Sequence, residues 1–398
     1  MFLNSIIRRN PEMIKWAVTL HQKGQIPSNS YVVDVDTVYD NAKILFDEAK
    51  KYELQIFAMT KQIGRNPILL DAIKRAGIDS CVTVDMNDAR PVHANGMKIG
   101  HLGHLVQVPH HETEAGMSFE PEYWTVFSYE KAKAISESIK GNREQKILAR
   151  IYADGDTFYK GHEGGFKAED IVEVRNRINQ MKGLKFVGIT SFPTQLFDEK
   201  EKKVVPTPNM ETLKKAAIVL KKAGMETVEI NAPGTTSSVL FKGLAEAGVT
   251  QVEPGNSLAG TIPSNAFEDF AETPAMIYVS EVSHKHNGKA YCYGGGMYVD
   301  PVFSAYDVNA LVGNTPIKAL NNKIICDIPD PSAIDYYGIL DTKENDDVRQ
   351  GDTVIFGFRA QTFVTRAYMV PVSGLKEGKP IVEGIYSVDG RKVGWPIW

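Results

Sequence analysis

Lys61 is the residue whose position most directly suggests chemistry. It closes a short apolar run in IFAMTKQIGRNP, just before Gly64 and Pro67 break the pattern. A lysine that follows apolar residues can be desolvated, and its amine is then nucleophilic enough to form a Schiff base. A single lysine is more often a solvated residue at the start of a loop, so other features of the chain must support this interpretation.

Two later loops carry the residue types that bind a phosphate. The first, EINAPGTTSSVLFKG, has a predicted strand end at Asn231 and a glycine that permits close backbone approach, followed by hydroxyl residues (Gly234, Thr235, Thr236, Ser237 and Ser238). The second, EPGNSLAGT, offers Gly255, Asn256 and Ser257. Free N–H groups at a helix start, together with hydroxyls, bind phosphate well. Helix capping by Ser and Thr is the alternative for one loop, but two such loops favour phosphate binding.

Short apolar runs alternate with mostly helical stretches from residue 54 onward, which predicts parallel βαβ units. Eight units in about 200 residues favour a TIM (β/α)8 barrel over an open doubly wound sheet. Lys61 then ends the first strand, and the two loops follow the last two strands, where such barrels usually bind phosphate. The runs are 54–60, 80–85, 105–108, 124–127, 146–152, 185–190, 227–231 and 250–254.

The chain divides into three predicted parts. Residues 1–29 read as a helical leader, 30–266 as the α/β barrel domain, and 267–398 as a C-terminal β domain. The last part is rich in β-forming residues, is interrupted by Gly, Pro and Asp, and lacks long helical patterns.

Composition excludes several classes of protein. The chain has 398 residues, a net charge of -4 and three cysteines, with no basic cluster and no long apolar stretch. We therefore expect no nucleic acid, no membrane association, no disulfides and a cytoplasmic location. HLGH (101–104) and His110-His111 have no accompanying ligand set, so surface or packing roles are expected for them and no metal site is predicted.

Several segments together resemble the fold-type III pyridoxal-phosphate enzymes, the alanine racemase-like superfamily, and most closely its YhfX branch. FAMTKQIGRNPILLDAIKRAGI resembles the segment with the cofactor-binding lysine, which implies that Lys61 carries pyridoxal 5′-phosphate. VEINAPGTTSS and QVEPGNSLAG resemble the phosphate-binding segments, and ILARIYADGDTFYKGHEGGF and FVGITSFPTQ resemble two further barrel strands. The resemblance runs from about residue 30 to the C-terminus.

Three departures from alanine racemases bear on the reaction. Glu253 replaces the arginine that faces the cofactor's pyridine nitrogen, and a carboxylate there keeps the nitrogen protonated and strengthens the electron sink. Ser191 and Phe192 stand where racemases have a histidine, for which His162 is a weak substitute. The His-x-Cys zinc pair of the D-serine and D-threonine enzymes is missing, which disfavours zinc-assisted chemistry.

The resemblance also implies a second acid/base group from the C-terminal domain of a partner subunit. Tyr293, Tyr298 and Cys326 are the candidates, and the sequence does not choose among them. Arg150, Arg359 and Arg366 are candidate cations for a substrate carboxylate, since guanidinium groups grip carboxylates bidentately, and Arg150 alternatively contacts the cofactor oxygen.

The sequence thus predicts a homodimeric, pyridoxal-phosphate-dependent racemase or epimerase with shared active sites, acting on the α-proton of a small amino acid. Three alternatives stay open: a decarboxylase of the same fold, a non-catalytic protein that carries the cofactor, and a barrel that binds another phosphate without a Schiff base.

Overall fold

The computed structural model describes residues 2–298, 302–303, 306–330, 333–342, 347–359 and 361–395. The chain forms two compact units. The barrel unit comprises Lys43–Thr60 and Gly77–Gly255, and the sheet unit comprises Met1–Ala42, Lys61–Ala76 and Asn256–Trp398. Within the described ranges, no helix is both long and apolar enough to cross a membrane.

The barrel unit is built on a parallel sheet that returns to its starting point. Strands β2 and β3 are two parts of one run around Phe57; β2 pairs with β13, and β3 pairs with β4. Since β8 (Phe166–Lys167) lies off this path, the ring has eight positions, and the predicted TIM-type barrel is confirmed. The strands are β2 Gln55–Ile56, β3 Ala58–Met59, β4 Ser80–Thr83, β5 Lys98–Leu102, β6 Tyr123–Val126, β7 Gln145–Tyr152, β9 Leu184–Thr190, β12 Glu229–Asn231 and β13 Gln251–Val252.

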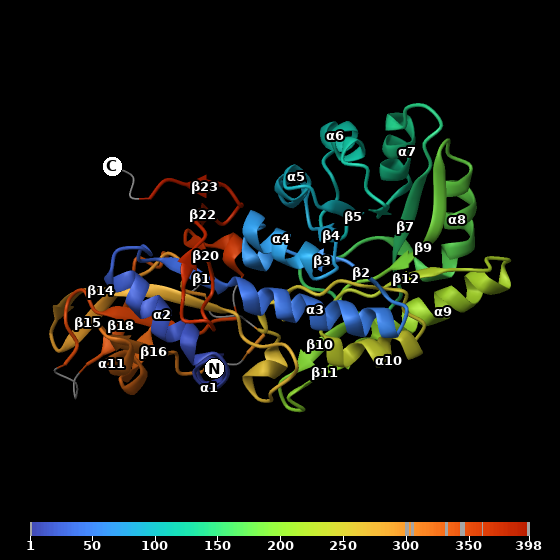
Figure 1. Ribbon diagram of the computed structural model, residues 1–398. Coiled ribbons are helices and arrows are strands. Elements are labelled where there is room, and N and C mark those ends of the chain that lie inside the picture. The colour runs from blue at the N-terminus through green and yellow to red at the C-terminus, as the bar shows by residue number, and fades with distance from the viewer. Residues whose placement is uncertain are drawn as a thin grey trace. The chain divides into compact units, whose positions relative to one another are not determined.

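Helices cover the outside of this ring, and α8 and α9 pack against β9 (Figure 1). Their starts follow local capping rules: Asp85 accepts a hydrogen bond from the backbone of Asp88, and Ser128 accepts one from that of Lys131. The helices are α3 Val35–Lys51 (shared between the units), α5 Met86–Ala94, α6 Thr113–Ser118, α7 Tyr129–Ser138, α8 Ile171–Asn179, α9 Pro208–Lys222 and α10 Phe241–Glu246. A hairpin, β10 Gln195–Asp198 with β11 Lys203–Pro206, follows β9.

The third barrel strand differs from the prediction. It is β5, Lys98–Leu102, and not the run at 105–108, which forms no strand. The sequence KIGHL hides this strand because Gly100 and His101 break up the apolar run. Both residues fit the interior for specific reasons: a Cβ on Gly100 would lie 2.2 Å from the Phe57 ring, and His101 is fully buried against polar partners.

The sheet unit contains an eleven-stranded sheet, in agreement with the predicted C-terminal β domain. Strand β1 (Ser30–Asp34) also belongs to it, pairing antiparallel with β14 and parallel with β20. The other strands run from β14 to β23: β14 Met276–His286, β15 Lys289–Tyr293, β16 Asn309–Gly313, β17 Lys323–Asp327, β18 Tyr337–Asp341, β19 Thr353–Phe356, β20 Tyr368–Ser373, β21 Ile381–Val382, β22 Ile385–Ser387 and β23 Lys392–Val393. The helices of this unit are α1 Phe2–Arg9, α2 Pro11–Gln22, α4 Pro67–Arg75 and α11 Pro316–Asn321.

Candidate active site

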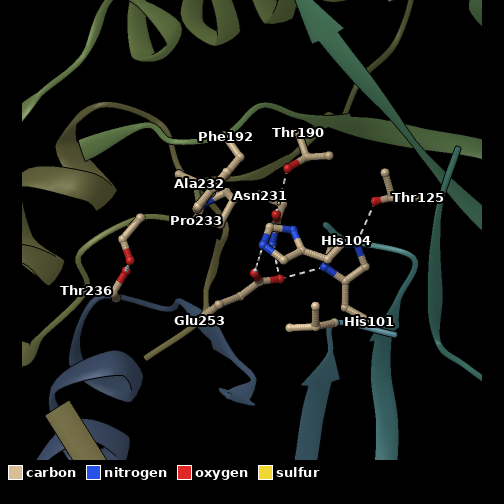
Figure 2. Close-up of polar contacts among 12 residues, drawn as sticks. His101, His104, Thr125, Thr190, Phe192, Asn231, Ala232, Pro233, Thr236 and Glu253 are labelled. Carbon is tan, nitrogen blue, oxygen red and sulfur yellow. Dashed lines mark hydrogen bonds and ion pairs between the residues drawn. The ribbon is translucent and has the colours of Figure 1, made fainter. Parts of the chain in front are cut away.

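Polar side chains fill the carboxyl end of the barrel, above an apolar layer formed by Phe57, Met59, Val82, Tyr123 and Leu148. Figure 2 shows this polar layer: His101 from β5, Thr125 from β6, Thr190 from β9, Asn231 from β12, Glu253 after β13, and His104 from the loop after β5. All six side chains are buried. Barrel interiors are usually filled by branched apolar residues, so this layer marks a site for chemistry.

Glu253 lies at the centre of the polar layer. Its Oε1 atom is 2.5 Å from Nδ1 of His101 and 2.8 Å from Nδ2 of Asn231, and its Oε2 atom is 3.3 Å from Nε2 of His104. Burial by itself would raise the pKa of the Glu253 carboxyl. The charges of His104 and His101, with hydrogen bonds from His101 and Asn231, instead hold that pKa below its usual value. The group is therefore a carboxylate at neutral pH.

The partners of Glu253 are themselves held in place. Nε2 of His101 is 2.6 Å from the hydroxyl of Thr125, and the hydroxyl of Thr190 donates to Oδ1 of Asn231 at 2.8 Å. These contacts fix the two groups that hydrogen-bond Oε1, the imidazole of His101 and the side-chain amide of Asn231. The carboxylate thus has one defined orientation.

His101, His104 and Glu253 are also side chains of metal-ligating type, with ligand atoms within 4.8 Å of one another. Ligands at about 2.0–2.2 Å around a tetrahedral zinc stand farther apart than the 2.5 Å between His101 and Glu253. The two atoms are instead close enough to share a hydrogen bond directly. Both histidines lie inside the barrel and not on its surface, whereas His110 and His111 are exposed.

The loop from Ala232 to Ser238 is the first predicted phosphate loop. Gln195 shapes it: its backbone oxygen accepts the Thr235 N–H, its amide contacts Thr236, and a Cβ on Gly234 would come within 2.5 Å of that same oxygen. Ser237 is at a helix N-cap position but makes no capping hydrogen bond, and its buried Oγ has no hydrogen-bond partner among the described residues. Capping therefore does not account for this hydroxyl.

The second predicted phosphate loop follows β13 through Gly255. Asn256 and Ser257 begin a 3-10 turn, Asn256–Ala259, and the Asn256 carbonyl accepts the Thr261 N–H at 2.9 Å. Both side chains are buried. The Ser257 hydroxyl has no hydrogen-bond partner within the described part of the chain, so it also is available to a ligand.

Arg150 and Ser191, both predicted to contact the cofactor, are buried and hydrogen-bonded within the barrel unit. The Arg150 guanidinium is buried over the Phe127 ring and donates to the backbone oxygens of His162 and Phe192 at 2.6 and 3.3 Å. Burial lowers the pKa of Arg150 to about 10, so it is still a cation at neutral pH. The Ser191 hydroxyl accepts a hydrogen bond from Asn209 at 3.0 Å. Both side chains brace loops of the barrel unit.

Lys61 begins a short 3-10 turn, Lys61–Ile63, immediately after Thr60 in the chain. Its side chain is half-buried, with Nζ 5.0 Å from the centre of the Phe363 ring. The turn belongs to the sheet unit and is held there by Thr362, whose hydroxyl donates to the carbonyls of Lys61 and Gln62 at 3.3 and 2.9 Å. The hydrogen bonds from Thr362 therefore fix the backbone at Lys61, and the Phe363 ring packs against its amine.

The C-terminal candidates separate into two groups. Tyr298, Cys326 and Arg366 line one cavity of about 990 Å³ in the sheet unit, whereas Tyr293 is exposed at the end of β15 outside its lining. A hydrogen bond with Cys292, together with burial, raises the pKa of the Cys326 thiol far above its ordinary value. Arg366 pairs with Asp335 at 2.9 Å. Arg359 is half-buried and does not line this cavity.

Sequence reasoning did not identify His101, His104 or Gln195 as site residues. The signal for the two histidines was present, because HLGH comes at the end of a strand and precedes a helix. Displacing that strand to 105–108 removed the histidines from the carboxyl end of the barrel.

Comparisons with known proteins agree with this architecture. Residues 33–263 match the family described as alanine racemase, N-terminal domain, and residues 277–382 match the one described as YhfX-like, C-terminal domain. The chain is 38% identical over 398 residues to the uncharacterized protein YhfX of Escherichia coli (strain K12), covering 99% of this chain and 100% of that one.

Two solved structures share the fold. D-threonine aldolase from Filomicrobium marinum has a TM-score of 0.70 at 16% identity, over 92% of this chain and 96% of that one. Alanine racemase of Clostridium difficile 630, in complex with cycloserine, has a TM-score of 0.65 at 15% identity, over 91% and 99%. At these identities the likeness establishes the architecture, while the reaction has to be argued from the site.

Proposed function

Because the chain belongs to the YhfX branch of the fold-type III pyridoxal-phosphate enzymes, we propose that it is an amino-acid racemase or epimerase that acts on the α-proton of a small amino acid. Members of this alanine racemase-like family use pyridoxal 5′-phosphate. The observation that supports the cofactor, which a racemase and a decarboxylase of this fold would share, is the buried Glu253 carboxylate with one oxygen that accepts no hydrogen bond from the described residues.

The residues present fit the cofactor. Its pyridine nitrogen, when protonated, requires a hydrogen-bond acceptor, and Oε2 of Glu253 is a buried acceptor available for one. Its phosphate requires donors, and the buried hydroxyls of Ser237 and Ser257 are donors without partners among the described residues. An unsatisfied buried polar atom is costly, so these atoms of Glu253, Ser237 and Ser257 support a bound polar ligand.

Each residue then has a separate task. Lys61 would hold the cofactor through Nζ and move a proton on one face of the substrate α-carbon. Glu253 would hold the ring nitrogen, while Asn231, Gly234, Thr235, Thr236, Ser237, Gly255, Asn256 and Ser257 would form the phosphate loops. Arg150 and Ser191 would support the cofactor from buried positions. The bound cofactor supplies an electron sink that makes the α-proton removable.

Reprotonation from the opposite face needs a second acid/base group. We assign this role to Tyr298 ahead of Tyr293 and Cys326, since Tyr298 lines the sheet unit's cavity, Tyr293 lies outside its lining, and the raised pKa of Cys326 makes that thiol a poor acid near neutrality. Ile325, Ile334 and Val364 line the same cavity and are 52–61% exposed. Exposed apolar residues gathered at one place support a second copy of the chain covering them, and hence a homodimer with shared active sites.

A decarboxylase of the same fold is the second candidate. Glu253 favours it, because a carboxylate at the ring nitrogen strengthens the electron sink that carbon dioxide release also requires. Solvent deuterium incorporation at the α-carbon without carbon dioxide release supports the racemase; stoichiometric carbon dioxide release supports the decarboxylase.

The test of the cofactor assignment is Lys61→Ala, with Lys74→Ala on the exposed side of α4 as the matched control. Purified wild type and the Lys74 variant should show the visible absorbance of lysine-bound cofactor, and borohydride reduction with peptide mapping should find the label on Lys61. The Lys61 variant should lose both signals. A wild type without the band, or a Lys61 variant that keeps it, would exclude the proposal.

A further inference from the structure

The polar layer of the barrel unit contains two histidines that the proposed function does not use. Resting on that function, we propose that His101 and His104 are positioning residues: they hold Glu253 ionised, with Oε1 fixed and Oε2 presented to the cofactor's ring nitrogen, so that the nitrogen keeps its proton. In this arrangement the two histidines, acting through Glu253, set the protonation state of the cofactor's ring nitrogen.

The first reason is that the layer is a poor way to gain stability. An ion pair buried in a protein interior costs about as much in desolvation as it returns, and apolar residues of the same volume are usually as stabilising or better. Here His101, His104 and Glu253 have side chains only 0%, 2% and 1% exposed. Ionisable groups retained in a barrel interior, with the pKa of the Glu253 carboxyl held below its usual value by its partners, point to a functional site.

The second reason is the asymmetry between the two oxygens of Glu253. Oε1 is within hydrogen-bonding distance of two groups, Nδ1 of His101 at 2.5 Å and the amide of Asn231 at 2.8 Å, which together fix the plane of the carboxylate. Oε2 accepts no hydrogen bond among the described residues and has an ion-pair contact with His104. A purely structural carboxylate would have both oxygens satisfied by hydrogen bonds.

The third reason is that the two histidines face different oxygens of Glu253 (Figure 2). His101 is held at both ring nitrogens, by Glu253 and by Thr125, and is therefore a rigid support. His104 faces Oε2 at 3.3 Å, with its ring 5.3 Å from the His101 ring and edge-on to Phe192 at 5.7 Å. His101 thus fixes orientation, and His104 sets the electrostatic environment of the oxygen that meets the ligand.

The experiment observes the ring nitrogen directly. Protein reconstituted with pyridoxal phosphate that carries ¹⁵N in the ring is examined by NMR, because the nitrogen shift separates protonated from unprotonated pyridine. Wild type should give the protonated signal, and Glu253→Gln should give the unprotonated one. His104→Phe and His101→Phe should move the signal toward that of Glu253→Gln, and His104→Gln, which keeps an N–H donor, should restore part of it. His110→Phe, at an exposed histidine of the same unit, should leave the signal unchanged.

Folding is measured on the same proteins. If His101→Phe unfolds, the double variant His101→Phe/Glu253→Gln should recover folding, because it removes the charge that His101 supports. A double variant no better folded than the single one overturns the inference.

The remaining outcomes are separable. A ring-nitrogen signal that is identical in wild type, His101→Phe and His104→Phe overturns this inference and leaves the proposed function intact. Absence of cofactor on Lys61 overturns both. One equivalent of tightly held metal in wild type that is lost in His101→Phe would replace the inference with a metal site.

Discussion

The polar candidate residues of the two units differ in their surroundings. In the barrel unit, His101, Thr125, Asn231 and Glu253 are buried and joined by hydrogen bonds of 2.5–2.8 Å; the first three lie on different strands and Glu253 directly follows a fourth. In the sheet unit, Tyr298 and Cys326 line an open cavity whose other walls include exposed apolar side chains. The polar layer of the barrel unit is a buried hydrogen-bonded network, whereas the cavity of the sheet unit is a surface that a second chain could cover.

This difference indicates how the proposed reaction divides between the units. Electrostatic stabilisation is strongest when the groups that provide it are fixed before the reaction and shielded from water, and the barrel's polar layer meets both conditions within one chain. Exposed apolar residues need a second surface to cover them. The cavity's exposed apolar lining, Ile325, Ile334 and Val364, is here called the rim, and it is not covered within one chain. Changes in the barrel layer should therefore alter chemistry, and changes at the rim should alter assembly.

The largest expected effect is that of Glu253→Gln. Removing the only carboxylate of the polar layer should lower kcat for α-proton exchange about 10²–10³-fold, as for other preorganised electrostatic groups, with little change in KM. Glu246→Gln, on the outside of α10, is the control. Exchange kinetics by NMR in deuterated solvent measure both. Equal kcat in the two variants would remove the barrel layer from the chemistry.

The next effect concerns the cavity of the sheet unit. Tyr298→Phe should slow α-proton exchange from one enantiomer about 10²–10⁴-fold, the usual contribution of a general acid or base, while exchange from the other enantiomer persists through Lys61. Tyr337→Phe, at an exposed tyrosine on β18 of the same unit, serves as the control. If both enantiomers slow together, Tyr298 is not the acid/base group specific to one face.

A smaller effect is expected at the rim. Ile334→Asp puts a charge on a 61% exposed residue of the cavity lining and should weaken dimerisation at least about tenfold, or about 1.4 kcal/mol. Ile317→Asp is the matched control, since that residue is 76% exposed on α11 and outside the cavity lining. Sedimentation velocity over a range of concentrations measures the change. A dimer of unchanged affinity would move the interface elsewhere.

The sequence allowed much of the barrel to be predicted because local patterns carry it. Strand-helix alternation gave the ring, and the ends of the seventh and eighth strands gave Asn231 and Glu253, which the structure joins by a 2.8 Å hydrogen bond. The role proposed for Lys61 came from its position and the family resemblance. These site residues lie within a few positions of the strand pattern that predicts them.

The histidine network could not be predicted because its partners are distant in sequence. His101 and Glu253 are 152 positions apart, and nothing near His101 indicates which carboxylate it meets. Its strand was also hidden, since a buried strand is expected to be apolar and this one keeps a glycine for Phe57 and a histidine for Glu253. Similarly, all five residues of β1 are buried, so no alternation of buried and exposed residues indicates which sheet the strand joins.

The smallest expected effect is on acid stability, and it tests whether the barrel layer is charged. The folded-state pKa of Glu253 is lower than its ordinary value of 4.5, so its ionised form stabilises the folded protein. That contribution is fully present above the unfolded-state pKa and is lost as the pH falls below about 4.5 toward the folded-state pKa, at about 1.4 kcal/mol for each unit between them. Urea unfolding from pH 6 to pH 3 should therefore show a shallower loss of stability in Glu253→Gln than in wild type, with Glu246→Gln following wild type. Parallel curves for all three proteins would mean that Glu253 has the same pKa in the folded and unfolded states, and the barrel layer would then do nothing to keep the carboxylate ionised.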